Sequence, residues 1–241
     1  MRQFKLIFAV QVILISANSY ADDKTEINPG AWEGNIELGI VNTSGNTETK
    51  TIYLKAKAAT ETEYWRHTLN YESLKSSDQG VTTADRYELN GQSDFKLDKK
   101  NFFFVMINYE DDQFSGYDYR MTEAIGYGRR VLDQPDLTLD LEIGPGARQS
   151  KPETGETENE TMVRGAGKLK WRISKTSRFS EDLSVEAGED STVTKSITAL
   201  SAQINGSLAT KITYTVKNIS DVPVGVKKTD TETAVTLVYN F

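Results

Sequence analysis

The 241-residue chain contains no cysteine and only one histidine, His67. Without cysteine it can form neither disulfides nor thiolate metal sites, and one histidine excludes a site built from several imidazoles. Beyond the N-terminal region, it also lacks any apolar run of the roughly 20 residues that a transmembrane helix requires. Helical periodicity is nearly absent. We therefore expect no cofactor and no bound metal, and these features argue against a helical membrane protein.

Positive charge is also scarce, with 28 Lys and Arg against 35 Asp and Glu. This balance argues against a basic patch and against nucleic acid as a partner. The mean hydropathy is low, which is compatible with a membrane barrel because its strands are apolar on one face only. The length suffices for one all-β domain and hardly for two.

The N-terminal residues predict an export signal. Arg2 and Lys5 precede an apolar run from Leu6 to Ala17, and Ser19-Tyr20-Ala21 follows as a small-x-small cleavage site. The run is too short to span a bilayer as a helix. We expect residues 1–21 to be a cleaved signal peptide, 22–31 a short periplasmic segment, and 32–241 the folded domain.

The rest of the chain alternates between apolar and polar residues with a period of two, which predicts half-buried strands. The clearest segment sets Leu137, Leu139 and Leu141 against Asp140 and Glu142. The joint between the tenth and eleventh strands, near residues 205–207, stays open. The predicted strands are 32–41, 48–59, 64–75, 86–97, 102–110, 119–132, 137–149, 162–173, 178–187, two within 193–205 and 211–218, and 231–241.

A soluble β-sandwich would show the same alternation, but two patterns favour an outer-membrane barrel. Tight connections such as 133–136 alternate with longer ones, predicted at 76–84, 111–118, 151–160 and 220–230. Aromatic residues on the apolar faces gather near one end or the other of the strands, as in the two girdles of a membrane barrel. The predicted fold is all-β, an antiparallel transmembrane β-barrel of about 12 strands.

The last strand carries its own signal. Val235, Leu237, Tyr239 and Phe241 share one face, and the final residue is aromatic. This pattern is typical of the closing strand of an outer-membrane barrel. We therefore expect the barrel-assembly machinery to recognise Phe241, and outer-membrane lipid and lipopolysaccharide to surround the barrel.

Several segments resemble a family of unknown function known as salt-induced outer membrane proteins. The matching segments are 42–47, 109–118, 126–128, 144–146 and 238–241. The resemblance implies a location in the outer membrane of a Gram-negative cell and a link with osmotic or salt stress. It supplies no catalytic residues.

The inward faces of the predicted strands carry charges of both signs. They could form a salt-bridge network that closes the barrel, or rings that select small solutes or ions in a porin-like pore. Barrels of about 8 strands are filled by side chains and those of about 16–18 hold channels, so twelve strands leave both open. The candidate lumen-lining residues are Arg86, Glu88, Asp94, Asp140, Glu142, Arg148, Arg164 and Lys168.

Two other readings of the chain remain. Hairpin pairing could bring His67 near Ser93, as a hydrolase embedded in the wall would need, but Ser93 lies in no recognised motif. Acidic segments at 110–118 and 153–160 could bind divalent cations of lipopolysaccharide, as in an adhesive surface barrel, or simply be solvated. The favoured prediction is a narrow pore or envelope-stress barrel that is not an enzyme.

Overall fold

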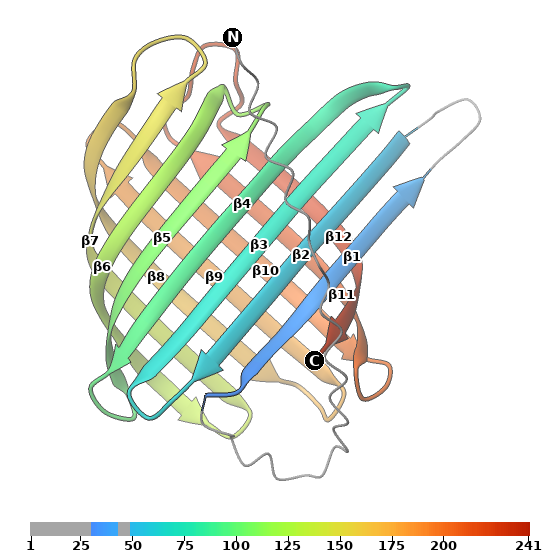
Figure 1. The fold of residues 1–241 in the computed structure, drawn as a ribbon, viewed down its shortest axis with the longest axis vertical. Helices are drawn as coiled ribbons and strands as arrows, with labels where there is room; N and C mark the ends of the chain where they lie inside the picture. Colours follow the sequence, from blue (N-terminus) through green and yellow to red (C-terminus); the bar gives the residue numbers. More distant parts are fainter. Residues whose placement is uncertain (1–29, 43–48) are drawn as a thin grey trace.

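Each strand pairs antiparallel with its neighbours in sequence, and β1 pairs with β12 to close the sheet into a barrel (Figure 1). The computed structural model describes residues 30–42 and 49–241, so the predicted signal peptide and most of the 22–31 segment lie outside the described residues. Among the described residues, no helix is long and apolar enough to cross a membrane. The strands are β1 (Trp32–Asn42), β2 (Thr49–Glu61), β3 (Trp65–Asp78), β4 (Val81–Lys96), β5 (Asn101–Asp112), β6 (Tyr117–Gln134), β7 (Leu137–Pro152), β8 (Glu158–Arg172), β9 (Ser177–Gly188), β10 (Thr192–Gln203), β11 (Leu208–Ile219) and β12 (Thr229–Asn240).

The predicted all-β barrel of 12 strands is confirmed. The connection between the tenth and eleventh strands, whose position the sequence left undecided, is a turn at residues 204–207. One predicted loop is wrong, because β3 and β4 extend to Asp78 and Val81 and leave only Gln79 and Gly80 between them. Both residues have positive φ, at 48° and 80°. A two-residue turn of this conformation matches the twist of a hairpin, so the polar strands continue where a loop was expected.

The two ends of the barrel differ. At one end, here named the short-turn end, the connections are two to four residues long: 62–64, 97–100, 135–136, 173–176 and 204–207. The C-terminus lies at this end (Figure 1). At the opposite end the described connections range from residues 79–80 to the nine residues 220–228. The predicted contrast in loop length therefore holds for 220–228 but not for every hairpin.

A compact turn at the short-turn end is held by Asp98. Its carboxylate accepts hydrogen bonds from the Asn101 side chain (2.7 Å) and from the backbone N–H groups of Lys100 (2.7 Å) and Asn101 (2.9 Å). The Asn101 side-chain bond, together with the two backbone bonds, lowers the pKa of Asp98. The four-residue connection is thus fixed by a side chain, as is usual for Asp in turns.

The alternation along each strand separates an inner from an outer face. In β5, Phe102, Phe104 and Met106 are buried inside, whereas Phe103 and Val105 are 52% and 59% exposed outside. The other strands repeat this arrangement with large apolar side chains on the outer face. They include Leu38, Ile52, Leu69, Leu89, Ile125, Ile143, Val163, Leu183, Ile212 and Leu237.

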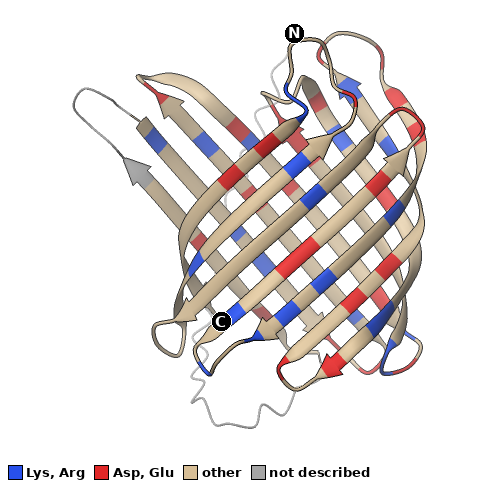
Figure 2. Cartoon of the chain, turned by 180° about the vertical axis from the view of Figure 1, so that it is seen from behind, with Lys and Arg blue, Asp and Glu red and all other residues tan. Residues whose placement is uncertain are grey.

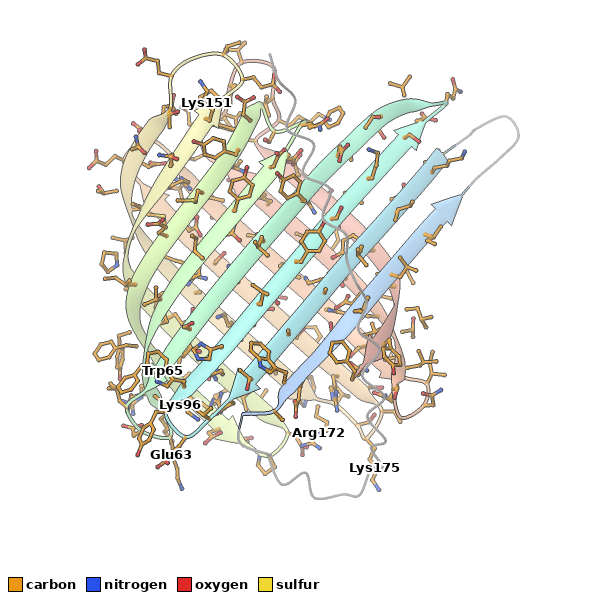
Figure 3. The ribbon with its side chains drawn as sticks, viewed as in Figure 1. Glu63, Trp65, Lys96, Lys151, Arg172 and Lys175 are labelled. Carbon is orange, nitrogen blue, oxygen red and sulfur yellow. The ribbon has the colours of Figure 1, made fainter. Side chains whose placement is uncertain are left out.

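Outer-face aromatic residues form two rows. Near the short-turn end, Trp65 packs on Phe95 with ring centroids 5.1 Å apart, and Phe103 meets Tyr127 at 6.1 Å. Towards the opposite end, Tyr109 stacks with both Tyr87 and Tyr119, each at 5.9 Å. Figure 3 shows Trp65 at the short-turn end and Lys151 at the other. The rows follow the sorting expected from the sequence and border an aliphatic belt.

Glu123 interrupts this belt. It lies on the outer face of β6 between Tyr119 and Tyr127, opposite Ile107 of β5 and Ala147 of β7. The side chain is exposed and makes no hydrogen bond or ion pair with the described residues. A carboxylate without a partner among the described residues thus stands beside the apolar side chains of the belt.

The seam between β1 and β12 is the shortest in the barrel. Its register spans four residue pairs, from Asn35–Asn240 to Leu38–Leu237, against eleven or more in the other strand pairs. Gly34 and Phe241 extend it by exchanging two backbone hydrogen bonds of 3.0 Å. A Cβ on Gly34 would lie 2.6 Å from Cζ of Phe241, so the aromatic ring occupies space that only glycine leaves free.

Deleting Phe241 is expected to reduce the yield of folded barrel several-fold, because it removes both of these hydrogen bonds and the ring from the shortest seam. The fraction of folded protein is measured by heat-modifiable migration in gels after expression. Deleting Thr154, in the exposed connection between β7 and β8, serves as the control. Equal yields from the two deletions would contradict this role of the seam.

Candidate functional site: the charged lumen

An apolar cluster fills one side of the lumen. Phe102, Phe104 and Met106 of β5 pack with Ala124 of β6 and Met162 of β8. The facing glycines make room for the rings. A Cβ on Gly128 would lie 2.2 Å from the Phe102 ring, and one on Gly126 2.8 Å from Phe104. These rings narrow the lumen from the β5–β8 side. The sequence already shows β5 to be apolar on both faces, but not how the space is filled.

Glu142 is the centre of the charged network that covers much of the remaining inner surface. Its side chain is 1% exposed and accepts hydrogen bonds from Lys168 Nζ (2.8 Å), Gln92 Nε2 (2.9 Å) and Arg164 Nη1 (3.1 Å). Lys168 also donates to Gln92 Oε1 at 2.9 Å. Since Gln92 belongs to β4 while Glu142 and Lys168 belong to β7 and β8, the two bonds of Gln92 cross the lumen.

Other bonds also join strands that are not neighbours. Arg86 of β4 binds Glu232 of β12 at 2.8 Å, as well as Glu72 of the adjacent β3. Lys195 of β10 binds Glu88 of β4 at 2.6 Å. Side chains from opposite walls therefore meet, and the free cross-section is much smaller than the backbone ring suggests. Figure 2 shows charges of both signs along the strands that carry these contacts.

Ion pairs between adjacent strands complete the network. Near the short-turn end, Arg66 binds Asp94 at 2.7 Å, and Arg130 binds Asp140 at 2.8 Å. Arg66 of β3 also lies 3.6 Å from Asp140 of β7, which is a further contact across the lumen. Towards the opposite end, Arg148 binds Glu160 at 2.6 Å. The Arg148 side chain is only 2% exposed. These contacts fit the first alternative for the inner charges, a salt-bridge network that stiffens the barrel.

Cavities of about 280 Å³ and 100 Å³ lie between these side chains. Glu88, Asn90, Arg164, Ser184 and Lys195 line both of them, so the cavities meet at this level. The larger one extends towards the short-turn end, where Arg66, Arg130 and Lys170 contribute to its wall. The lumen thus contains cavities that can hold water molecules between polar side chains.

The eight candidate residues lie as follows. Glu88, Asp94, Asp140, Arg164 and Lys168 line the larger cavity, and Glu88, Arg148 and Arg164 line the smaller one. Arg86 and Glu142 contact these residues or their neighbours in the network. Sequence reasoning missed Lys57, Arg66 and Lys195 as candidates, although their alternation places them on the same inner face.

One acidic residue expected in an external segment lies elsewhere. Glu110 is part of β5, 7% exposed, and pairs inside the barrel with Lys217 and with Arg120 at 3.3 Å. The strand continues to Asp112, so the predicted loop begins later than expected. Among the described residues no group of acidic or imidazole side chains could hold a metal ion.

His67 lies on the outer face of β3, opposite Ser93 of β4, with Nδ1 2.9 Å from the serine Oγ. The predicted proximity is therefore correct. The imidazole stacks on Trp65 with centroids 5.6 Å apart. No carboxylate among the described residues bonds to the imidazole, so nothing here orients it as the third group of a triad does.

The fold is shared with outer-membrane porins and channels. The NanC porin superposes with a TM-score of 0.53 at 11% identity, over 87% of this chain and 98% of that chain. The COG4313 outer membrane channel from Pseudomonas putida F1 gives 0.51 at 10% identity, over 92% and 100%. At such low identity the likeness concerns the fold alone.

The chain belongs to the family described as "Protein of unknown function, DUF481", whose model matches residues 36–241. It is 28% identical over 239 residues to the uncharacterized protein YdiY of Escherichia coli (strain K12), covering 93% of this chain and 92% of that protein. The resemblance to a barrel family of unknown function is thus supported. The link with salt stress stays a prediction.

Proposed function

We propose that this protein is an outer-membrane β-barrel whose lumen forms a narrow, hydrated passage for small charged solutes, and that it carries out no catalysis. One observation supports this most strongly: the outer face is an aliphatic belt between two rows of aromatics, while the inner face carries charges around a cavity of about 280 Å³. An apolar exterior with a polar interior is the arrangement of a membrane barrel and the reverse of a soluble protein.

The surroundings follow from this placement. Lipid and lipopolysaccharide surround the belt, the short-turn end faces the periplasm, and the assembly machinery recognises the last strand. On the family resemblance alone, we extend the proposal to a role in salt stress. A strain lacking the gene would then grow more slowly than its parent at high salt, and equal growth would remove that role.

An epitope tag inserted in residues 153–157 is expected to bind antibody on intact cells, because this connection lies at the end opposite the short turns. The same tag in residues 135–136 should be detected only after permeabilisation. Flow cytometry measures both, and total tag is quantified in blots as the control. Surface labelling of the 135–136 insertion alone would show that the barrel has the opposite orientation.

Liposomes containing the purified protein are expected to swell in isotonic solutions of glycine or arginine and not of the trisaccharide raffinose. The side chains that cross the lumen leave room for small solutes only. The initial rate of turbidity loss measures entry, and empty liposomes give the background. Background rates with every solute would favour the alternative, a structural barrel closed by its salt bridges.

A hydrolase embedded in the wall is the second candidate, and the His67–Ser93 hydrogen bond is the observation that favours it. A serine nucleophile needs a neighbouring base, and this pair supplies both groups on the outer face. Hydrolysis of short-chain esters or phospholipids by the wild type, lost in Ser93→Ala and in His67→Ala, would establish it. No hydrolysis by the wild type would leave the pair as wall residues.

A further inference from the structure

We propose that the larger cavity contains a binding site for small anions bearing a carboxylate or phosphate group, centred on Lys57 of β2 and Lys170 of β8. This inference deepens the proposed passage by naming the solute class that the passage would favour. The site itself can be tested whether or not the barrel conducts.

The two lysines differ from the other basic residues around the cavity. Lys57 and Lys170 both line it, and neither has an ion pair with any described residue. The six other basic residues of the lining each pair with a carboxylate at 3.3 Å or less: Lys55, Arg66, Arg130, Arg164, Lys168 and Lys195. Two ammonium groups are therefore left without a counter-charge in contact.

The local field makes these two positions attractive for an anion. The positive charge of Lys170 repels that of Lys57, and Lys168 and Lys211 add to the positive potential at Lys57. Arg66 and Lys168 do the same at Lys170. Asp182 partly offsets this potential at both lysines, as Asp140 does at Lys170, but neither carboxylate makes an ion pair with either lysine. Since like charges repel more strongly away from bulk water, an anion between them would relieve the repulsion.

The rest of the lining fits a small organic anion. Thr68, Asn70 and Thr138 offer neutral hydrogen-bonding groups, and Ile197 adds apolar surface. A volume of about 280 Å³ is at the lower end of ligand pockets. Lysine ammonium groups bind phosphate and carboxylate as point charges without a fixed planar geometry. The site would therefore recognise the negative charge of an anion that is small enough to enter the cavity.

The site lies towards the short-turn end of the lumen. Lys57 is four residues from the end of β2 at Glu61, and Lys170 is two residues from the end of β8 at Arg172. In the proposed orientation, a solute from outside first passes the Arg86–Glu232 and Lys195–Glu88 ion pairs and then reaches the two lysines. The two lysines would hold an anion on the periplasmic side of these two ion pairs.

Calorimetric titration of the purified protein with inorganic phosphate tests the site directly. The wild type is expected to bind saturably, Lys57→Gln and Lys170→Gln each to bind at least ~10-fold more weakly, equivalent to about 1.4 kcal/mol, and the double variant not at all. Lys99→Gln removes the same charge from the exposed turn 97–100 and should bind as the wild type does. Heat-modifiable migration confirms that each variant is folded.

Ion selectivity in planar bilayers separates the site from the passage. Under a potassium chloride gradient, the double variant should show a reversal potential shifted towards cation preference relative to wild type and Lys99→Gln. Binding without conductance would uphold the site and reject the passage. Absence of phosphate binding by the wild type, or equal binding by the double variant, would overturn the site even if the barrel conducts.

Discussion

Replacing Glu142 with alanine is expected to lower the free energy of unfolding by about 3–5 kcal/mol, the range for breaking a buried ion pair from one side. The carboxylate is 1% exposed and is the shared acceptor for Arg164, Lys168 and Gln92. Its loss leaves the Arg164 guanidinium, 9% exposed, with the more distant Glu186 at 3.9 Å as its one carboxylate partner among the described residues. Lys168 retains Gln92 alone.

Urea unfolding of the refolded protein in lipid vesicles, followed by tryptophan fluorescence, measures this loss. Glu156→Ala provides the matched control, because Glu156 lies exposed in the connection between β7 and β8 and has no ion pair with the described residues. We expect the control to change stability by less than about 0.5 kcal/mol. If Glu142→Ala were as stable as Glu156→Ala, the inner network would not contribute to barrel stability.

Replacing Val105 with arginine is expected to destabilise the inserted barrel by about 2–4 kcal/mol, the cost of a cationic side chain near the bilayer midplane. Val105 is 59% exposed on the outer face, between the aromatic row at Phe103 and the one at Tyr109. Leu97→Arg, at the short-turn end, should cost about 0–1 kcal/mol because charge is tolerated near the interfaces. Equal effects at the two positions would contradict the placement of the belt in a membrane.

Glu123 gives the converse of this test. Glu123→Leu should stabilise the barrel, since it removes a carboxylate that stands between Ile107 and Ala147 without a partner among the described residues. The same urea titration measures the gain. Lower stability of Glu123→Leu would show that the carboxylate makes a favourable contact in the membrane.

Most of the fold could be predicted from the period-two alternation of apolar and polar residues. It predicts the face of nearly every side chain, because a strand turns successive residues to opposite sides and an apolar exterior tolerates few exceptions. Strand ends are harder to predict. Beyond the belt both faces are polar, so the alternation fades while the hydrogen-bonded hairpin continues, as in β3 and β4 up to Gln79-Gly80.

The network inside the lumen could be predicted only in part. Alternation indicates that Arg86 and Glu232 face inwards, but they are 146 residues apart and meet only because the closed barrel brings β4 opposite β12. The lack of ion pairs at Lys57 and Lys170 depends in the same way on which walls face each other. The pairing of His67 with Ser93 was predictable, because adjacent strands fix their register through the hairpin.

Single-channel recording of the purified protein in planar bilayers tests the central claim most directly. A narrow hydrated lumen predicts discrete conductance steps that are much smaller than those of 16-stranded porins and that are carried preferentially by anions. The Glu142→Ala variant, which loses the cross-lumen bond from Gln92 and the adjacent-strand bond from Lys168, should give larger steps. A membrane-inserted, folded protein with no steps at any salt concentration or voltage would contradict the passage and leave a closed, salt-bridged barrel.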